Sequence, residues 1–187
     1  TVAEARLTCG RYADRVVSVD WSGAGMLGIS FTVISVIGRI PGDEALHVLY
    51  MEIMPFHTSD DEQALRVKEL MNIFAAKLIA HDFGGAGRIR ETLLVHCGVP
   101  QELIIPIAYV KASVAPLMTL KPVDADNPRA YFSTDKARSV SLVCACIKKK
   151  KILFPRYESC SAALAHFLAL TAEASPTKHG TESYYIG

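Results

Sequence analysis

Several features that would place this chain of 187 residues in a familiar class are missing from its sequence. No run of about 20 apolar residues offers a transmembrane helix, and no basic and apolar leading segments form a secretory signal. We therefore expect a protein that is neither membrane-bound nor secreted. The five cysteines include no Cys-x-x-Cys pair, which argues against a structural zinc site. The Gly-x-x-x-x-Gly-Lys-Ser/Thr motif of P-loop ATPases is absent as well.

An excess of charge of either sign is also lacking. The net charge is +1, which excludes a globally basic nucleic-acid coat but leaves a local basic groove open. Half of the residues are apolar and 21% are charged, as is typical of a folded chain with a buried core. The length suits one domain. Residues 1–14 have no clear period and are predicted to be an entry segment or linker, and residues 15–187 are predicted to form the domain.

The spacing of apolar residues predicts an α/β domain. Short β-branched runs over residues 15–20, 29–37 and 46–54 predict three antiparallel strands. The pattern then predicts a helix over 59–76, a strand over 77–82, a helix over 88–96, a strand over 103–110, a loop or irregular hairpin over 111–133, a helix capped by Ser133 or Thr134, and a last helix over 159–174. This order predicts a mixed sheet with helices on its faces.

Two aspartates carry the strongest chemical signal. Asp20 and Asp82 each end an apolar strand, and each is followed by a turn that contains glycine. If the two strands are parallel neighbours, both carboxylates lie at the same edge of the sheet, where they repel each other unless a cation intervenes. Mg²⁺ or Mn²⁺ suits such oxygens, and a pair of ions about 3.5–4 Å apart can hydrolyse a phosphodiester. The alternative is that both are ordinary turn residues.

Basic residues near these motifs are candidates for sequence-independent contacts with DNA phosphates. They follow the second glycine turn, lie in the long loop, or open the helix after it. The candidates are Arg88, Lys111, Lys121, Arg129, Lys136 and Arg138. Solvated helix ends are the alternative interpretation. His81 alternates with Asp82 along its strand, so it is expected to face the other side of the sheet and to pack in the core.

Three motifs in one order make the sequence resemble the nuclease domain of phage large terminase subunits. They are Val16-Val-Ser-Val-Asp-Trp-Ser-Gly23, Ile79-Ala-His-Asp-Phe-Gly-Gly-Ala-Gly87, and Tyr131-Phe-Ser-Thr-Asp-Lys-Ala-Arg138 followed by Ile152-Leu-Phe-Pro155. The resemblance covers roughly residues 15–158. It implies an RNase H-like fold.

The resemblance also implies a function. A domain of this kind is a Mg²⁺- or Mn²⁺-dependent endonuclease, with two ions, that cuts concatemeric double-stranded DNA during viral genome packaging in the host cytoplasm. Asp20 and Asp82 match the family's first two metal ligands, and its third acid is expected just after Gly187, so the domain is expected to be cut short at its C-terminal end. The implied partners are the terminase ATPase domain, the small terminase subunit and the portal protein.

Alternatives to the third acid and to the function stay open. Glu52, Asp135 and Glu182 are possible substitutes, but a solvated strand residue, a helix cap and a tail residue are the simpler interpretations. The first motif alone also occurs in actin-like nucleotide-binding domains. A non-catalytic module that docks on DNA or on the packaging motor is the other candidate.

Overall fold

The computed structural model describes most of the chain. The described residues are 2–22, 31–85, 87–110, 116–125, 127–155, 160, 161, 165, 172–176 and 182–186, with the backbone alone for 4, 172–176 and 182–186. Among these residues no helix has the length and apolar character needed to cross a membrane.

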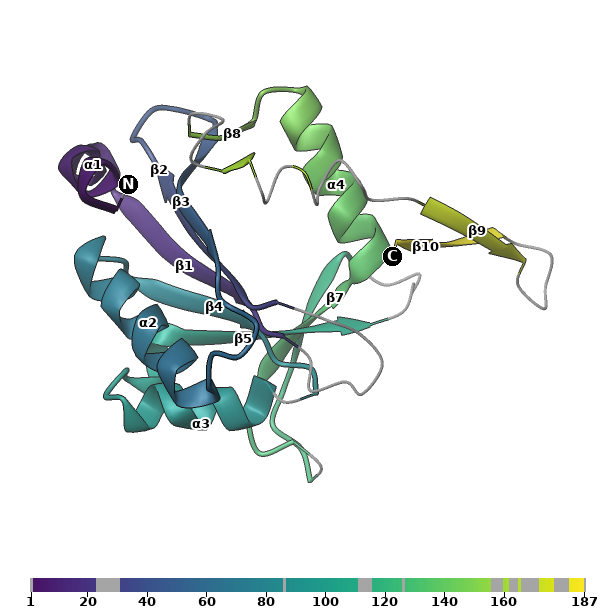
Figure 1. The fold of residues 1–187 in the computed structure, drawn as a ribbon. Helices are drawn as coiled ribbons and strands as arrows, with labels where there is room; N and C mark the ends of the chain where they lie inside the picture. The colour runs from purple at the N-terminus through teal and green to yellow at the C-terminus, as the bar shows by residue number, and fades with distance from the viewer. Residues whose placement is uncertain are drawn as a thin grey trace.

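An eight-stranded sheet forms the centre of the molecule (Figure 1). Its strands, in spatial order, are β6 (Met118–Lys121), β7 (Tyr131–Asp135), β5 (Ile104–Val110), β4 (Leu78–Asp82), β1 (Asp14–Asp20), β2 (Val33–Arg39), β3 (Leu46–Ile53) and β8 (Ile152–Leu153). Strands β1, β2 and β3 pair antiparallel, whereas β1, β4, β5 and β7 run parallel. The predicted mixed sheet, antiparallel strands first and parallel strands after, is confirmed.

Helices cover the two faces of the sheet unequally. α2 (Asp60–Ile73) and α3 (Gly87–His96) pack together on one face, and α4 (Lys136–Lys148) lies on the other side (Figure 1). The described residues also form α1 (Val2–Thr8), two short 3-10 helices, η1 (Cys9–Arg11) and η2 (Gln101–Leu103), and a separate two-stranded sheet of β9 (Ala172–Pro176) and β10 (Glu182–Ile186).

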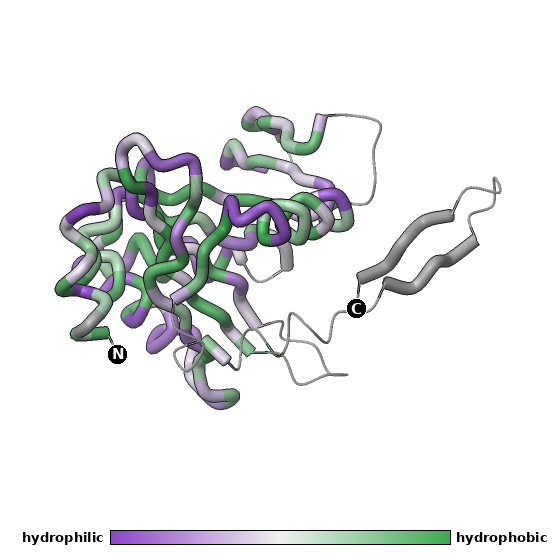
Figure 2. Tube along the Cα trace, turned by 90° about the horizontal axis from the view of Figure 1, so that it is seen from above, coloured by the Kyte–Doolittle hydropathy of each residue, from purple (hydrophilic) through white to green (hydrophobic). Residues whose placement is uncertain are grey.

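The main core lies between the sheet and α2. Val17 and Val19 of β1 are buried toward the helices, whereas Val16 and Ser18, which alternate with them, are only half-buried. This period of two is typical of a strand with one strongly covered face. Figure 2 shows hydrophobic residues along the central strands and hydrophilic residues at the outer turns. The capping box of Ser59 and Glu62 begins α2, as the sequence predicts.

Several boundaries differ from the sequence-based expectations. Residues 1–14, predicted as an entry segment or linker, contain helix α1, and half-buried Val2, Ala5 and Cys9 pack against the core. The irregular hairpin, one of two alternatives over 111–133, is present as β6 paired antiparallel with Tyr131–Thr134 of β7, and β7 extends two residues beyond that range. Strand β7 continues to Asp135 because the residue still pairs with Val110, so Asp135 caps α4 and the caps proposed at Ser133 and Thr134 are wrong.

The last predicted helix is wrong at its C-terminal end. Residues 172–174 belong to strand β9, where Ala172 pairs with Ile186 and Ala174 with Tyr184. The described residues 161 and 165 are helical, and most of the other positions of this predicted helix lie outside the described residues.

Candidate metal centre

The two aspartates singled out by the sequence lie side by side. Strands β1 and β4 are parallel, and their register runs from Val16 opposite Leu78 to Val19 opposite His81. The next residue of each strand is Asp20 and Asp82. Because neighbouring strands are about 4.8 Å apart and paired residues point to the same face, both carboxylates project from one face at one edge of the sheet.

The negative charge of Asp82 acts on the ionisation of Asp20. The pKa of Asp20 is raised above its ordinary value, first because burial penalises the charged form and second because the negative charge of Asp82 repels it. The ammonium group of Lys136 acts in the opposite direction and lowers the pKa. Two acids that raise the free energy of each other's ionised form are a suitable environment for a divalent cation, which removes the repulsion.

Small residues after β4 leave room at Asp82. The backbone N–H of Gly84 donates a hydrogen bond of 2.8 Å to Oδ1 of Asp82, and Gly85 has a positive φ of 53°. A Cβ atom added to Gly87, the first residue of α3, would overlap the carbonyl oxygen of Asp82. The glycine turn therefore holds the carboxylate in one orientation and allows α3 to begin directly behind it.

A buried network supports the back of the site. His81, 2% exposed, faces α3, as the sequence predicts for a residue that alternates with Asp82. The indole N–H of Trp21 donates to Nδ1 of His81 at 3.1 Å, and Nε2 of His81 lies 3.1 Å from Oε2 of Glu91. A carboxylate can only accept, so Nε2–H of His81 donates to Glu91, and Nδ1 of His81 also lies 3.0 Å from the carbonyl oxygen of Asp82. Nε of Arg129 then donates to Oε1 of Glu91 at 2.7 Å.

Arg90 of α3 holds the chain just after the end of β1, on the face of the sheet that α3 covers. This buried side chain of α3 donates a hydrogen bond of 2.7 Å to the carbonyl oxygen of Ser22, two residues after Asp20. It also donates to Asp60 at the beginning of α2 and lies over the ring of Trp21. Both strand ends that carry the aspartates are thus attached to α3. No local pattern in the sequence marks a contact between a helix and a distant strand end, so the roles of Arg90 and Glu91 cannot be predicted from the sequence.

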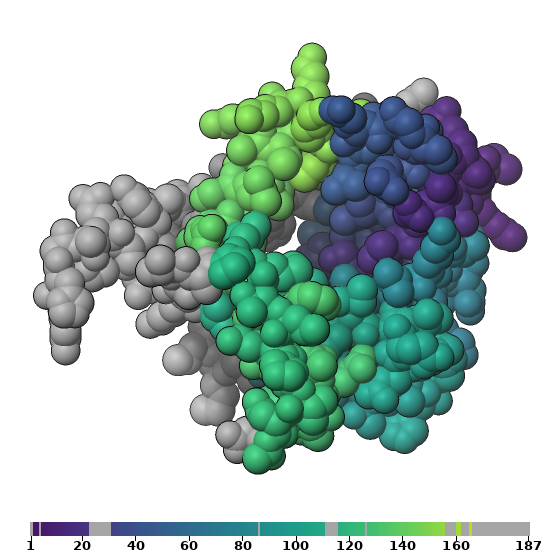
Figure 3. Space-filling view, turned by 180° about the vertical axis from the view of Figure 1, so that it is seen from behind, coloured from purple at the N-terminus to yellow at the C-terminus, as the bar shows by residue number. Residues whose placement is uncertain are grey.

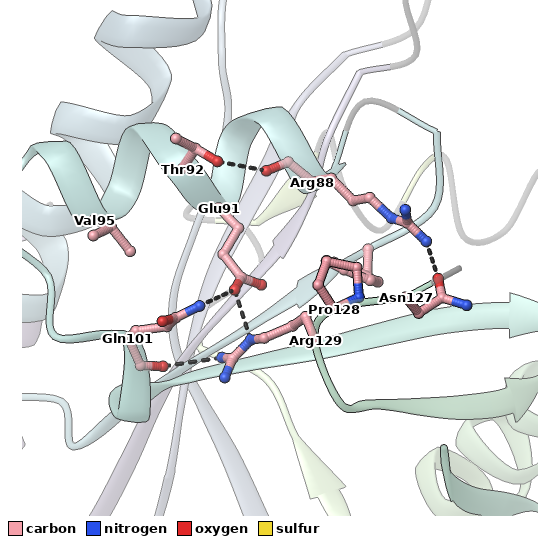
Figure 4. A pocket seen from close by; sticks show the side chains of 9 residues that line it. Arg88, Glu91, Thr92, Val95, Gln101, Asn127, Pro128 and Arg129 are labelled. Carbon is pink, nitrogen blue, oxygen red and sulfur yellow. Dashed lines mark hydrogen bonds and ion pairs between the residues drawn. The ribbon is translucent and has the colours of Figure 1, made fainter. Parts of the chain in front are cut away.

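The predicted DNA-contacting residues are divided between the two faces. Arg129 donates to Glu91 and to the carbonyl oxygens of Gln101 and Ile104, and therefore lies on the α3 side (Figure 4). Arg88 lies on the same side, over the ring of Phe83.

The α3 side also contains a cavity of about 380 Å³ lined by both arginines. Its polar side chains bond to one another: Arg88 donates to Asn127, and Glu91 accepts from Arg129 (Figure 4).

The remaining basic candidates lie elsewhere. Lys136, exposed at the beginning of α4, acts on Asp20 and so lies by the acid pair. Lys121 is exposed on the edge strand β6, and the backbone N–H of Arg138 donates to the capping carboxylate of Asp135. Lys111 lies outside the described residues.

The proposed substitutes for a third acid do not join Asp20 and Asp82. Glu52 pairs with Ile34 across the sheet, which places it on the α2 face, where Arg66 donates to both of its oxygens. Asp135 caps α4 through Oδ1, and its buried Oδ2 has no hydrogen-bond partner. Among the residues whose side chains are described, no group of three acidic, histidine or cysteine side chains is placed to hold a metal ion. The side chain of Glu182 is not described.

Comparisons with known proteins give no sequence relative and a clear structural likeness. No protein family and no curated protein matches the sequence. The structure is similar to the large terminase of a thermophilic bacteriophage, with 14% identity and a TM-score of 0.58, over 93% of this chain and 36% of that one. The chain thus spans little more than a third of that terminase.

Isolated nuclease domains match over more of their own length. A mutant nuclease domain of the large terminase subunit gp2 of bacterial virus Sf6, with manganese and beta-thujaplicinol, has 13% identity and a TM-score of 0.53, covering 99% of this chain and 83% of that one. A second gp2 mutant, with calcium, has 15% identity and a TM-score of 0.50 at the same coverage. The fold implied by the sequence motifs, an RNase H-like sheet like that of terminase nuclease domains, is confirmed.

Proposed function

We propose that this domain is a metal-dependent endonuclease of a viral DNA-packaging terminase, acting on double-stranded DNA. The observation that carries the proposal is the register of β1 and β4, which brings Asp20 and Asp82 together on one face of the sheet. The likeness in fold to terminase nuclease domains supports the same conclusion. The acid pair is not needed to stabilise the fold, because two adjacent carboxylates repel each other.

Asp20 and Asp82 are the residues that would hold Mg²⁺ or Mn²⁺, two ions in our proposal. When bound, such ions stabilise the negative charge that develops on a phosphodiester during hydrolysis. The protein itself supplies orientation: Gly84 donates to Asp82, and Arg90 fixes the chain just after Asp20. Lys136 adds a positive charge beside the pair, where it attracts the DNA backbone. The proposed contacts between the protein and the DNA are with phosphates, so cleavage is expected to be independent of the DNA sequence.

The context of this activity also belongs to the proposal. In a packaging motor the domain would act beside an ATPase domain, a small terminase subunit and a portal protein, in the cytoplasm of the infected host cell. The net charge of +1 suggests that the isolated domain binds DNA weakly and that other parts of the motor contribute to binding.

Cleavage of supercoiled plasmid in Mn²⁺ tests the proposal. We expect nicked and linear products from the wild type, none with EDTA, and a rate at least about 10²-fold lower for Asp82→Asn, which keeps the shape of the side chain and removes a charge. Asp61→Asn is the matched control, because Asp61 is an exposed acid in the first turn of α2, on the other face. Equal loss in both variants, or full activity of Asp82→Asn, would contradict the assignment.

A non-catalytic docking module is the second candidate. It is favoured by one observation, that the described side chains offer two acids at this site and no third ligand. Mn²⁺ titration followed by electron paramagnetic resonance separates the two functions, since it measures ion binding without cleavage. Mn²⁺ binding that is lost in Asp82→Asn supports the nuclease, whereas DNA binding without any Mn²⁺ binding supports the docking module.

A further inference from the structure

Tyr109 lies on the same sheet face as the two aspartates. Strand β5 is parallel to β4, and Ile107 pairs with Asp82. Tyr109 is two residues further along β5, so its side chain points to the same face, just beyond the carboxyl end of β4.

Tyr109 is also partly open to solvent. The residue is 49% exposed, although it continues a strand whose preceding residues are buried or half-buried. Cross-strand pairing continues this face toward the sheet edge: Tyr109 pairs with Thr134, and Thr134 with Met118 of β6. Leu120, two residues along β6, lies on the same face.

The residues Tyr109, Met118 and Leu120 form what we call the apolar ledge. Met118 is 48% and Leu120 is 57% exposed. Figure 3 shows the surface hollowed between α4, in light green, and the strands in blue and teal. The apolar ledge therefore extends from the acid pair to the edge of the sheet along an accessible face.

The chemistry of a phenol suits a position beside the acid pair. Ionised carboxylates only accept hydrogen bonds and repel a phosphate. A lysine or arginine in contact with both acids would compete with a bound cation for their charge. A phenol donates a hydrogen bond without bringing a positive charge, and its ring offers an apolar surface to a sugar or a base.

We propose that Tyr109 holds the DNA strand at the acid pair, its hydroxyl donating to a phosphate oxygen and its ring, with Met118 and Leu120, contacting the adjacent deoxyribose. This inference rests on the proposed function for its substrate. It makes Tyr109 a residue for substrate binding, distinct from the metal ligands. Tyr109→Phe removes the donor and keeps the ring, and Tyr109→Ala removes both.

DNA binding can be measured without cleavage. The probe is a fluorescein-labelled DNA duplex in Ca²⁺, followed by fluorescence anisotropy with the full chain. We expect Kd to rise about tenfold for Tyr109→Phe, the effect of one hydrogen bond to a charged group, and further for Tyr109→Ala. Val110→Ala is the matched control, since Val110 is 41% exposed on the same strand but faces the other side, and its Kd should stay at the wild-type value.

Two further readouts separate this role from a structural one. The Tm and the Mn²⁺ affinity of Tyr109→Phe should equal those of the wild type, and in plasmid cleavage KM should rise while kcat changes little. An unchanged Kd in Tyr109→Phe, or an equal loss of Mn²⁺ binding, would overturn the inference. If the chain never cuts plasmid but its DNA binding depends on the Tyr109 hydroxyl, the inference stands and the proposed nuclease activity falls.

Discussion

Two consecutive residues of the sheet show the largest difference between its two faces in the partners of a polar side chain. His81 and Asp82 are consecutive residues of β4. His81 is buried against α3 and bonded to Trp21 and Glu91, whereas Asp82 points to the opposite face toward Asp20. One peptide unit therefore separates a buried imidazole that is bonded within the fold from a carboxylate that lies beside a second carboxylate.

The contrast extends over both faces. On the α2 and α3 face the charged side chains are paired: Glu91 with Arg129, Glu52 with Arg66, and Arg90 with Asp60. On the other face the charge of Asp82 raises the pKa of Asp20. Charges that serve stability are compensated within the fold, whereas an uncompensated cluster in a stable domain is typical of a functional site. Three predictions test this distinction, from the largest expected effect to the smallest.

The largest effect is expected on the paired face. Glu91→Ala leaves the N–H of His81 and the guanidinium of Arg129 without their shared partner in a buried position. We expect the free energy of unfolding to fall by about 3–5 kcal/mol, measured by urea denaturation. Glu102→Ala, at an exposed acid of η2, should change it by less than about 0.5 kcal/mol. Equal stability of the two variants would show that the network does not hold the paired face.

An intermediate effect is expected where the faces meet, at the glycine turn. The added Cβ of Gly87→Ala overlaps the carbonyl oxygen of Asp82, so the backbone must shift and the free energy of unfolding should fall by about 1–3 kcal/mol. The shift also moves Asp82, so Mn²⁺ affinity should fall. At Gly84 the added Cβ would lie 3.1 Å from Oδ1 of Asp82, a contact that a small movement relieves. Gly84→Ala should therefore retain more stability and more Mn²⁺ affinity, and the reverse order would contradict this account.

The smallest effect is expected from the acid pair in the metal-free protein. Because the pKa of Asp20 is higher in the folded than in the unfolded chain, its ionisation opposes folding at neutral pH. Asp20→Asn should therefore raise the Tm at pH 7 in EDTA. This gain should shrink as the pH falls through the folded-state pKa and vanish below about 3.9, where both states are protonated.

Adding Mn²⁺ should reverse the order of the Tm values of the wild type and Asp20→Asn. Mn²⁺ should raise the Tm of the wild type, because it binds the folded state, and should raise that of Asp20→Asn much less. If Asp20→Asn were less stable than the wild type in EDTA at pH 7, the carboxylate of Asp20 would stabilise the fold. The contrast between the two faces of the sheet would then be lost.

The sequence is informative wherever a local period decides the outcome. The alternation in β1 and β4 assigns His81 and Asp82 to opposite faces, and parallel strands bring Asp20 and Asp82 together, without any knowledge of distant contacts. The capping box at Ser59 marks the beginning of α2 in the same way. The resemblance of three motifs to a terminase nuclease domain supplies the fold, which local periodicity alone does not determine.

Contacts between distant segments cannot be predicted in this way. Arg129 is a candidate for phosphate contact because it lies in a basic, proline-containing loop, but its donors bind Glu91 and two carbonyl oxygens 25 or more residues away in sequence. The position of Tyr109 relative to Asp82 depends on the register of β4 and β5, which no short pattern encodes. Strand β7 extends beyond the predicted irregular hairpin to Asp135, which is also the cap of α4.

The alternation of His81 and Asp82 limits which insertions and deletions this domain can tolerate during evolution. Adding or removing one residue within β4 before Asp82 would exchange the faces of both side chains, placing an imidazole beside Asp20 and a carboxylate in the apolar core. A change of two residues would restore the faces but shift the acid along the strand. Length variation among descendants of this sequence should therefore accumulate in the segments between strands, such as 122–130 between β6 and β7, while β1 and β4 keep their lengths.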